Sequence, residues 1–274
     1  MRIKTITLCL LVTVMILSCQ KEELSYDANR AKSDVPLLSK VLVDNQLLYE
    51  YSYNDSSLIT EDKSKFDLTI HHYNKKGMLA STKFYGIDDI LSIDAQIFQA
   101  AMNSKVWVTA ENGVKGGSMT YEYNEYGQLI KTTYLWPLST ISEYSVFSYD
   151  ANNKISRQTM YWGTMPTGYI NYSYDGKGNL IKEMLYNLPS DGAAELITTT
   201  QYDFDNEQNP YRSSGKMMIP GINTNKNNII KETYTIHLTA ALGPDKVKIN
   251  TNTYVYNGLG YPVSKYGNAT YIYK

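Results

Sequence analysis

The sequence predicts an all-β protein in which consecutive antiparallel hairpins form one extended twisted sheet or open barrel. Two observations lead to this prediction. Tyrosine is strongly enriched, with 26 tyrosines against 5 phenylalanines in 274 residues, and it favours strands that are only partly buried. A unit of the form Tyr-x-Tyr-Asn/Asp-x-x-Gly-x-Leu-x-Lys also recurs along most of the chain.

The repeat unit has the chemistry of a β-hairpin. Asn or Asp opens a type I turn because its side chain can accept a hydrogen bond from the backbone two residues on. Gly three residues later supplies the left-handed conformation of a bulged turn, and we expect Asn153 and Asn227 to take this place where Gly is missing. The clearest copies begin at Tyr121 and Tyr172, and degenerate copies begin at Tyr51, His71, Phe147, Tyr202 and Tyr254.

A three-residue loop also predicts the pairing between the two strands. We expect Tyr123 to lie opposite Leu129 and Tyr121 opposite Lys131, all on one face, so that an aromatic–aliphatic pair is followed by an aromatic–cation pair. The same geometry predicts the pairs Tyr174–Leu180, Tyr172–Lys182, Tyr149–Ile155, Phe147–Arg157, Phe204–Pro210 and Tyr202–Arg212.

Two segments interrupt the repeats. Residues 88–104 predict one short helix, because Asp88 and Asp89 can cap it and Ile90, Ile93 and Ile97 follow at helical spacing. Residues 213–226 are rich in Gly, Asn and Pro, which is typical of an excursion loop.

The amino terminus predicts an export signal. Arg2 and Lys4 precede an apolar run, residues 6–17, that is too short to span a bilayer of about 30 Å. Ile16-Leu17-Ser18-Cys19 resembles the lipobox of bacterial lipoproteins. This resemblance implies cleavage before Cys19 and attachment of a diacylglycerol and a further acyl chain, such as palmitate, at that residue.

The alternative is an ordinary signal peptide with an incidental cysteine. The cysteine count argues against it, because Cys9 lies in the discarded segment and would leave Cys19 as a lone exported thiol. We therefore expect a lipoprotein signal peptide at 1–18, a lipidated flexible tether at 19–34 and a hairpin-repeat domain at 35–274. Several buried acyl chains would anchor such a protein stably in the membrane.

The residues after the cysteine carry a second resemblance. Lys21-Glu22-Glu23 is similar to the surface-export signal of lipoproteins in Bacteroidetes-type bacteria, and it implies display on the outer membrane surface. The alternative for these residues is a plain solvated tether.

The repeat itself resembles the YD/RHS-type repeat, over roughly residues 45–274. The whole chain is similar to repeat lipoproteins of unknown function in Bacteroidetes-type bacteria. The resemblance implies a sheet built from repeats and leaves the molecular function open.

The chemistry-bearing residues give no constellation for catalysis. His71 occupies a tyrosine slot and strand alternation sends His72 to the opposite face, so we expect no metal site. The sequence has neither a Gly-x-Ser-x-Gly elbow nor a phosphate-binding glycine loop. We expect no enzymatic activity and no cofactor, and the net charge of -1 predicts no nucleic-acid partner.

One group of residues is a candidate binding site. Trp136 and Trp162 lie at the same distance after the bulge positions of consecutive repeats, residues 127 and 153. We expect them to be neighbours on the face opposite the tyrosine row and, with Tyr134, to form a flat stacking platform for sugar rings. The alternative is structural packing under the loops at Pro137 and Pro166.

These features predict a non-enzymatic, lipid-anchored outer-membrane protein that binds a polysaccharide or another envelope protein. A structural or assembly lipoprotein that docks a protein partner through its tyrosine face is the alternative, and a hydrolase is the third. In each case, we expect the membrane to be reached through the lipid at Cys19.

Overall fold

The computed structural model describes residues 35–87, 107–137, 139–190, 192–214, 219–239, 243–266 and 268–274. The expected signal peptide and tether, with Cys19, lie outside these ranges, and so does the helix predicted at 88–104. The described residues belong to one compact unit, Val35–Lys274.

This unit is a single all-β sheet of 17 strands, which confirms the predicted fold class. The strands are β1 (Leu38–Val43), β2 (Gln46–Tyr53), β3 (Ile59–Lys63), β4 (Asp67–Tyr73), β5 (Leu79–Gly86), β6 (Val114–Tyr123), β7 (Leu129–Leu135), β8 (Glu143–Tyr149), β9 (Ile155–Trp162), β10 (Met165–Tyr174), β11 (Leu180–Asn187), β12 (Glu195–Phe204), β13 (Ile229–Ile236), β14 (Lys246–Thr251), β15 (Tyr254–Tyr256), β16 (Pro262–Lys265) and β17 (Ala269–Tyr273).

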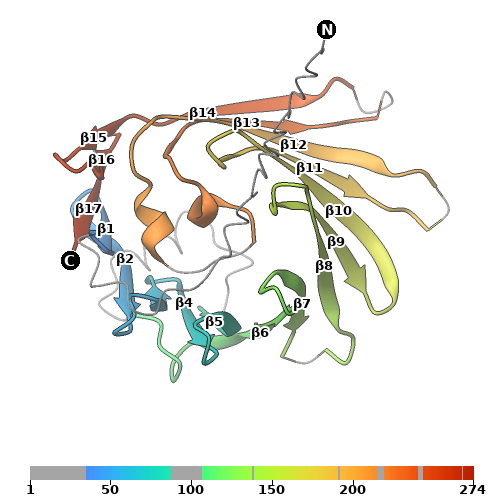
Figure 1. The fold of residues 1–274 in the computed structure, drawn as a ribbon, viewed down its shortest axis with the longest axis horizontal. Coiled ribbons are helices and arrows are strands. Elements are labelled where there is room, and N and C mark those ends of the chain that lie inside the picture. Colours follow the sequence, from blue (N-terminus) through green and yellow to red (C-terminus); the bar gives the residue numbers. More distant parts are fainter. Residues whose placement is uncertain are drawn as a thin grey trace, which may run out of the picture. The chain divides into compact units, whose positions relative to one another are not determined.

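The strands form an antiparallel meander that curves round, as Figure 1 shows. Each strand from β1 to β13 pairs with the next in sequence. On its other side, β1 pairs with the last strand, β17. Strand β17 pairs in turn with β16, and β16 pairs with β15. The described residues of β14 and β15 share no ladder, so the sheet remains open between these two strands.

The turns have the predicted hydrogen bonds. The side-chain oxygen of Asn124 accepts bonds from the backbone N–H of Tyr126 (3.0 Å) and Gln128 (2.9 Å). Gly127, at the bulge position, has a φ of 76°. The prediction for Asn153 is confirmed by a φ of 59°, and Ser57 takes the same conformation with a φ of 59° in the first repeat.

The aromatic–aliphatic pair next to each of these turns forms as expected. Tyr123 lies opposite Leu129. The equivalent pairs also form, Tyr174 with Leu180 and Tyr149 with Ile155. The aliphatic member is buried in every case, so these pairs line the inner face of the sheet, the face that carries its core.

The predicted aromatic–cation pairs are wrong by one residue. Ile130 is the extra residue of the bulge, so Lys131 lies opposite Glu122 and Tyr121 lies opposite Thr132. A bulge sets two residues against one and therefore exchanges the faces of all the residues that follow it. The same shift places Tyr172 opposite Glu183 and Phe147 opposite Gln158.

The cations instead reach aromatic rings of the next strand on the outer face. The Lys131 ammonium lies 4.9 Å from the ring centroid of Tyr144. The Arg157 guanidinium lies 4.2 Å from the ring centroid of Tyr169. The cation–π pairing is therefore present, but it joins neighbouring repeats rather than the two strands of one hairpin.

In most repeats a tyrosine hydroxyl connects the hairpin with the strand before it; Phe204, at the equivalent position of one repeat, has no hydroxyl. The ladder between β7 and β8 begins at Lys131 and does not reach the carbonyl of Leu129. The hydroxyl of Tyr149, from the next repeat, donates to this carbonyl (2.9 Å). Burial raises the pKa of Tyr149 to about 12, so the phenol remains a donor at neutral pH. The same bond runs from Tyr53 to Leu38, Tyr73 to Ile59, Tyr123 to Leu79, Tyr174 to Ile155 and Tyr273 to Pro262.

One repeat is split by a long insertion. Phe204 pairs with Ile229 and Tyr202 with Glu232, so the pairs predicted with Pro210 and Arg212 are wrong. The hairpin is completed by β13, after the insertion. Asp205 still accepts a bond from the backbone N–H of Asn228 (3.0 Å), as the first residue of an intact turn does.

The insertion contains the 3-10 helices η2 (Pro210–Ser214) and η3 (Ile222–Thr224), where the sequence predicted only a loop. Figure 1 shows these orange elements inside the curve of the strands. Ile219 packs against the core cluster around Leu129 and Leu180, and Tyr211 packs against the cluster around Leu38. The insertion therefore supplies part of the core.

Buried asparagines hold the insertion to the turn before β11. The Asn179 side chain accepts bonds from the backbone N–H of Lys226 (2.8 Å) and Asn227 (3.0 Å). The Asn225 side chain accepts a bond from the backbone N–H of Leu180 (2.8 Å). Asn227 therefore has a role in this network, and its φ is not positive, so its predicted bulge role is wrong.

Removing one ladder hydroxyl tests the tyrosine bonds. Tyr123→Phe should lower the free energy of unfolding by about 1–2 kcal/mol, because the Leu79 carbonyl loses its donor while buried. Urea unfolding measures this change. Tyr126→Phe is the control, since Tyr126 is 78 % exposed and should be replaceable at no cost. Equal stability of the two variants would show that the ladder contributes nothing.

One turn contains two glycines that together test the bulge assignment, one at the bulge position and one outside it. Gly178 has a φ of 87°, whereas Gly176 has no such φ and has open space around an added Cβ. Gly178→Ala should cost about 1–2 kcal/mol of stability, because an L side chain is strained in the left-handed region. Gly176→Ala should be close to neutral in the same unfolding experiment. Equal costs would contradict the bulge assignment.

Candidate functional site

The predicted aromatic residues gather at the ends of three neighbouring strands. Glu143, the first residue of β8, lies opposite Tyr134 of β7 on one side and opposite Trp162 of β9 on the other. Directly opposed residues point to the same face, so these three side chains form a row across the sheet. Trp136 follows β7 and joins the row beside Tyr134. We call these four residues the tryptophan row.

The predicted face of this row is wrong. Tyr134 has the same parity along β7 as Thr132, which pairs with Tyr121 of the inner tyrosine row. Trp162 has the same parity along β9 as Gln158, which pairs with the core residue Phe147. The tryptophan row therefore lies on the inner face, at the strand ends far from the turns. The bulge residue in each repeat again accounts for the difference.

The row differs from a flat platform. The rings of Tyr134 and Trp136 have centroids 4.6 Å apart and meet edge to face at 63°. The Trp136 indole N–H donates to the Glu143 carboxylate (2.8 Å). The two indoles therefore flank a carboxylate. Glu143 was not predicted as part of the site, although its place follows from the strand register once the bulge residue is counted.

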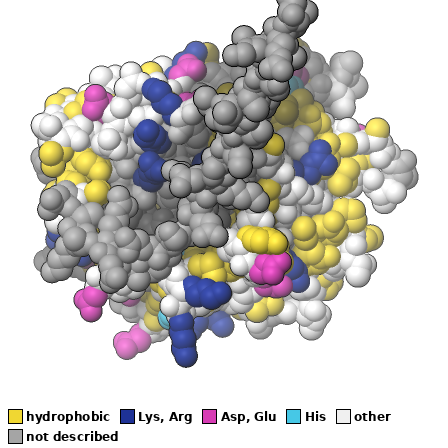
Figure 2. All heavy atoms as spheres, in the orientation of Figure 1, with side chains coloured by type: hydrophobic (Ala, Val, Ile, Leu, Met, Phe, Trp, Pro, Cys, Tyr) yellow, Lys and Arg dark blue, Asp and Glu magenta, His cyan; other side chains and the backbone are white. Residues whose placement is uncertain are grey.

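Both indoles are accessible. Trp136 is 47 % exposed and Trp162 is 42 % exposed, so neither is packed away under a loop. Leu135, Ile141 and Met165 are also exposed near these strand ends. Figure 2 shows hydrophobic side chains gathered on the side of the molecule where β8–β10 lie in Figure 1.

Close packing holds Tyr134 in place. Its hydroxyl donates to the carbonyl of Gly116 (2.7 Å), and its ring stacks on Phe84 with centroids 5.8 Å apart. A Cβ on Gly117 would lie 2.8 Å from the Tyr134 hydroxyl. The absence of a side chain at Gly117 makes room for the ring over β6, which fixes one end of the row.

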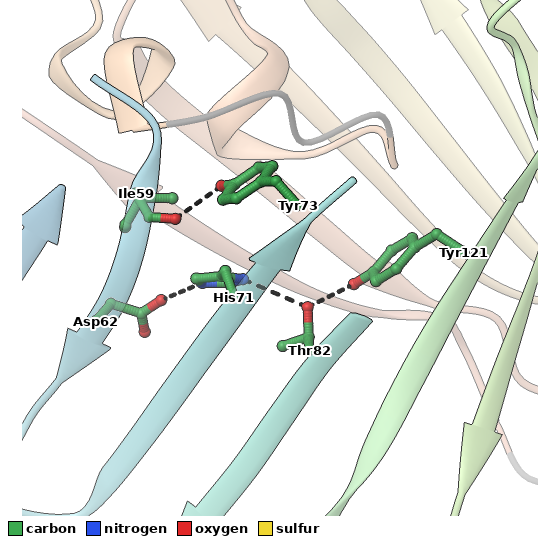
Figure 3. Close-up of polar contacts among 6 residues, drawn as sticks. All are labelled: Ile59, Asp62, His71, Tyr73, Thr82 and Tyr121. Atoms are coloured by element: carbon green, nitrogen blue, oxygen red, sulfur yellow. Dashed lines mark hydrogen bonds and ion pairs between the residues drawn. The ribbon is translucent and has the colours of Figure 1, made fainter. Parts of the chain in front are cut away.

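A polar network at His71 lies elsewhere on the inner face, as Figure 3 shows. One ring nitrogen of His71 lies 2.8 Å from the Asp62 carboxylate, and the other lies 3.3 Å from the Thr82 hydroxyl. That hydroxyl lies 3.1 Å from the hydroxyl of Tyr121. The order carboxylate, imidazole and hydroxyl matches a hydrolase relay. Thr82 is only 1 % exposed, however, so its hydroxyl has no access to a substrate.

The other histidine of this strand lies as predicted. His72 is exposed, whereas His71 is buried, so the two side chains point to opposite faces. The described residues contain no group of three or more His, Cys, Asp or Glu side chains placed to hold a metal ion. A membrane-crossing helix is also absent from the described ranges.

The strand pairing defines this chain as a β-hairpin repeat protein. No protein-family model matches it, and no curated protein does. The resemblance to YD/RHS-type repeat lipoproteins therefore remains a prediction from the sequence.

Some solved structures are similar to the chain at low identity. A porin-like protein from Bacteroides uniformis is 12 % identical, with a TM-score of 0.41 over 86 % of this chain and 98 % of its own. A porin-like protein from Bacteroides vulgatus is 11 % identical, with a TM-score of 0.37 over 87 % of this chain and 99 % of its own. TcdB2-TccC3 without its hypervariable C-terminal region is 11 % identical, with a TM-score of 0.26 over 81 % of this chain and 13 % of its own. With TM-scores below 0.5, these likenesses establish neither a common fold nor a common function.

Proposed function

We propose that this chain is a lipid-anchored outer-membrane protein, displayed at the cell surface, that binds glycans through the tryptophan row and catalyses no reaction. The observation that supports glycan binding is the exposure of Trp136 and Trp162 on either side of Glu143. The lipobox-like sequence at Cys19 supports the anchor.

The chemistry of the row suits a sugar chain. An exposed indole offers a flat apolar surface to the C–H face of a pyranose ring. The Glu143 carboxylate, although bonded to the Trp136 indole, retains acceptor positions for sugar hydroxyls. One strand separates β7 from β9, so the row extends over roughly 10 Å. That span fits a short stretch of polysaccharide better than a single small molecule.

Tryptophan fluorescence tests glycan binding. Titration with a panel of neutral polysaccharides should shift the emission for at least one of them, because the ligand covers two of the protein's three tryptophans. The double variant Trp136→Ala, Trp162→Ala should lose at least tenfold in affinity, measured by affinity electrophoresis.

Trp107→Phe serves as the matched control, because Trp107 lies outside the row. This variant should bind like the unaltered protein. An unchanged emission spectrum across the whole panel, or full affinity in the double variant, would refute glycan binding.

A protein partner is the second candidate. It is favoured by the exposed Ile141 and Met165 near the indoles, because apolar side chains clustered with tryptophan are typical of protein-docking surfaces. An envelope protein bound there would make the chain a structural or assembly component.

The lipid anchor has its own test. Cys19→Ala should move the protein from the membrane fraction to the soluble fraction, because no acyl chain can then be attached to the sulfur. Fractionation followed by immunoblotting measures this. Ser18→Ala is the control, since a small residue before the cysteine is retained. Membrane retention of the Cys19→Ala protein would rule out lipidation at this residue.

A further inference from the structure

A cavity of about 290 Å³ lies on the inner face, lined by different residues from the tryptophan row. One wall is formed by Tyr49 and Tyr51 of β2 and by Asp62 of β3. Tyr211 of η2 and Asn223 of η3 contribute the wall from the insertion. Its volume is close to the lower end of the range for small-ligand sites.

The strand register brings the sheet wall together. Tyr51 and Asp62 are directly opposed across β2 and β3, so both point to the inner face. Tyr49 lies two residues before Tyr51 and shares that face. The rings of Tyr49 and Tyr51 have centroids 6.4 Å apart and planes 28° from parallel, so they form a nearly continuous aromatic surface beside the carboxylate.

Tyr51 departs from the pattern of the other repeats. The hydroxyl at this position bonds to Gln158 in the case of Tyr172 (2.8 Å) and to Glu183 in the case of Tyr202 (3.0 Å). Among the described residues, the Tyr51 hydroxyl has no hydrogen-bond partner. A hydroxyl that is paired in these two repeats here faces a cavity instead, as a group that binds a ligand would.

Asp62 is held in place by His71. A carboxylate only accepts hydrogen bonds, so the His71 nitrogen that lies 2.8 Å from it carries a proton. The other His71 nitrogen lies 3.3 Å from the Thr82 hydroxyl, which lies 3.1 Å from the Tyr121 hydroxyl. Figure 3 shows the second Asp62 oxygen turned away from His71.

The cavity is electrically negative. The described residues that line it include no lysine or arginine, and Asp62 supplies their only carboxyl group. Burial and then the charges of Asp67 and Asp62 raise the pKa of Tyr49, as expected for a phenol in a negative potential.

We propose that this cavity is a binding site for a small organic cation of the alkylammonium class. The ammonium group lies between the Tyr49–Tyr51 surface and the Tyr211 ring, where the ring faces attract it, and Asp62 supplies the opposite charge. Hydroxyl and amide groups of Tyr51 and Asn223 bind the polar part of the ligand. A neutral polyol could form hydrogen bonds here but would gain no charge interaction with Asp62 and the ring faces.

A pair of ligands with the same shape tests the role of charge in the unaltered protein. Choline and its neutral carbon analogue, 3,3-dimethyl-1-butanol, are titrated separately by isothermal titration calorimetry. Choline should bind at least tenfold more tightly than the neutral analogue, because only choline interacts electrostatically with the rings and Asp62.

Substitution then locates the site. Asp62→Asn keeps the shape of the side chain and should weaken choline binding at least tenfold. Asp203→Asn is the matched control, because Asp203 is exposed and paired with Lys231 at 3.6 Å, away from the cavity lining. It should bind choline like the unaltered protein. Thermal unfolding, recorded in parallel, shows whether each variant is folded.

Several outcomes would overturn the proposal. Equal affinities for choline and its neutral analogue would remove the electrostatic basis, and this comparison does not depend on any variant folding. Absence of choline binding, unchanged binding in a folded Asp62→Asn protein, or binding of a neutral monosaccharide such as glucose in its place would do the same. The result is independent of glycan binding at the tryptophan row, since Trp136→Ala should leave choline binding intact.

Discussion

The hydrogen bond from a tyrosine hydroxyl to the backbone carbonyl of the preceding repeat is the contact on which this architecture depends. Each bulged turn delays the start of the next ladder and leaves one carbonyl beyond its reach, as at Leu129. That carbonyl belongs to a buried residue, so it would be costly without a donor. Tyr149 supplies the donor from the following hairpin. Phenylalanine would fill the same space but would leave the carbonyl unpaired, which favours tyrosine at these positions.

The sequence carries enough information for the fold class, the turns and the first pair of each hairpin. Asn and Asp at the turn and Gly at the bulge act through local backbone geometry, which the sequence shows directly, as at Gly127. The second pair was mispredicted because a bulge adds one residue to a strand, so that Lys131 moved to the other face. The same omission put Trp136 and Trp162 on the wrong face.

The site was accessible to sequence reasoning only in part. The pairing of Trp162 with Glu143 follows from the strand register once the bulge residue is counted, so the tryptophan row could have been predicted from the sequence. The cavity was not, because Tyr211 and Asn223 come from an insertion whose path depends on long-range contacts such as those of Asn179. No local pattern in residues 213–226 indicates which strands the insertion covers.

The split repeat has a consequence for how such a chain can change. Asp205 and Asn228 keep the hydrogen bond of an uninterrupted turn although more than twenty residues separate them, roughly five times the usual hairpin loop. The register of β12 and β13 therefore does not depend on the length or sequence of the segment inserted between them. A turn of this kind can therefore accept an inserted segment over the inner face of the sheet without a change in the strand pairing.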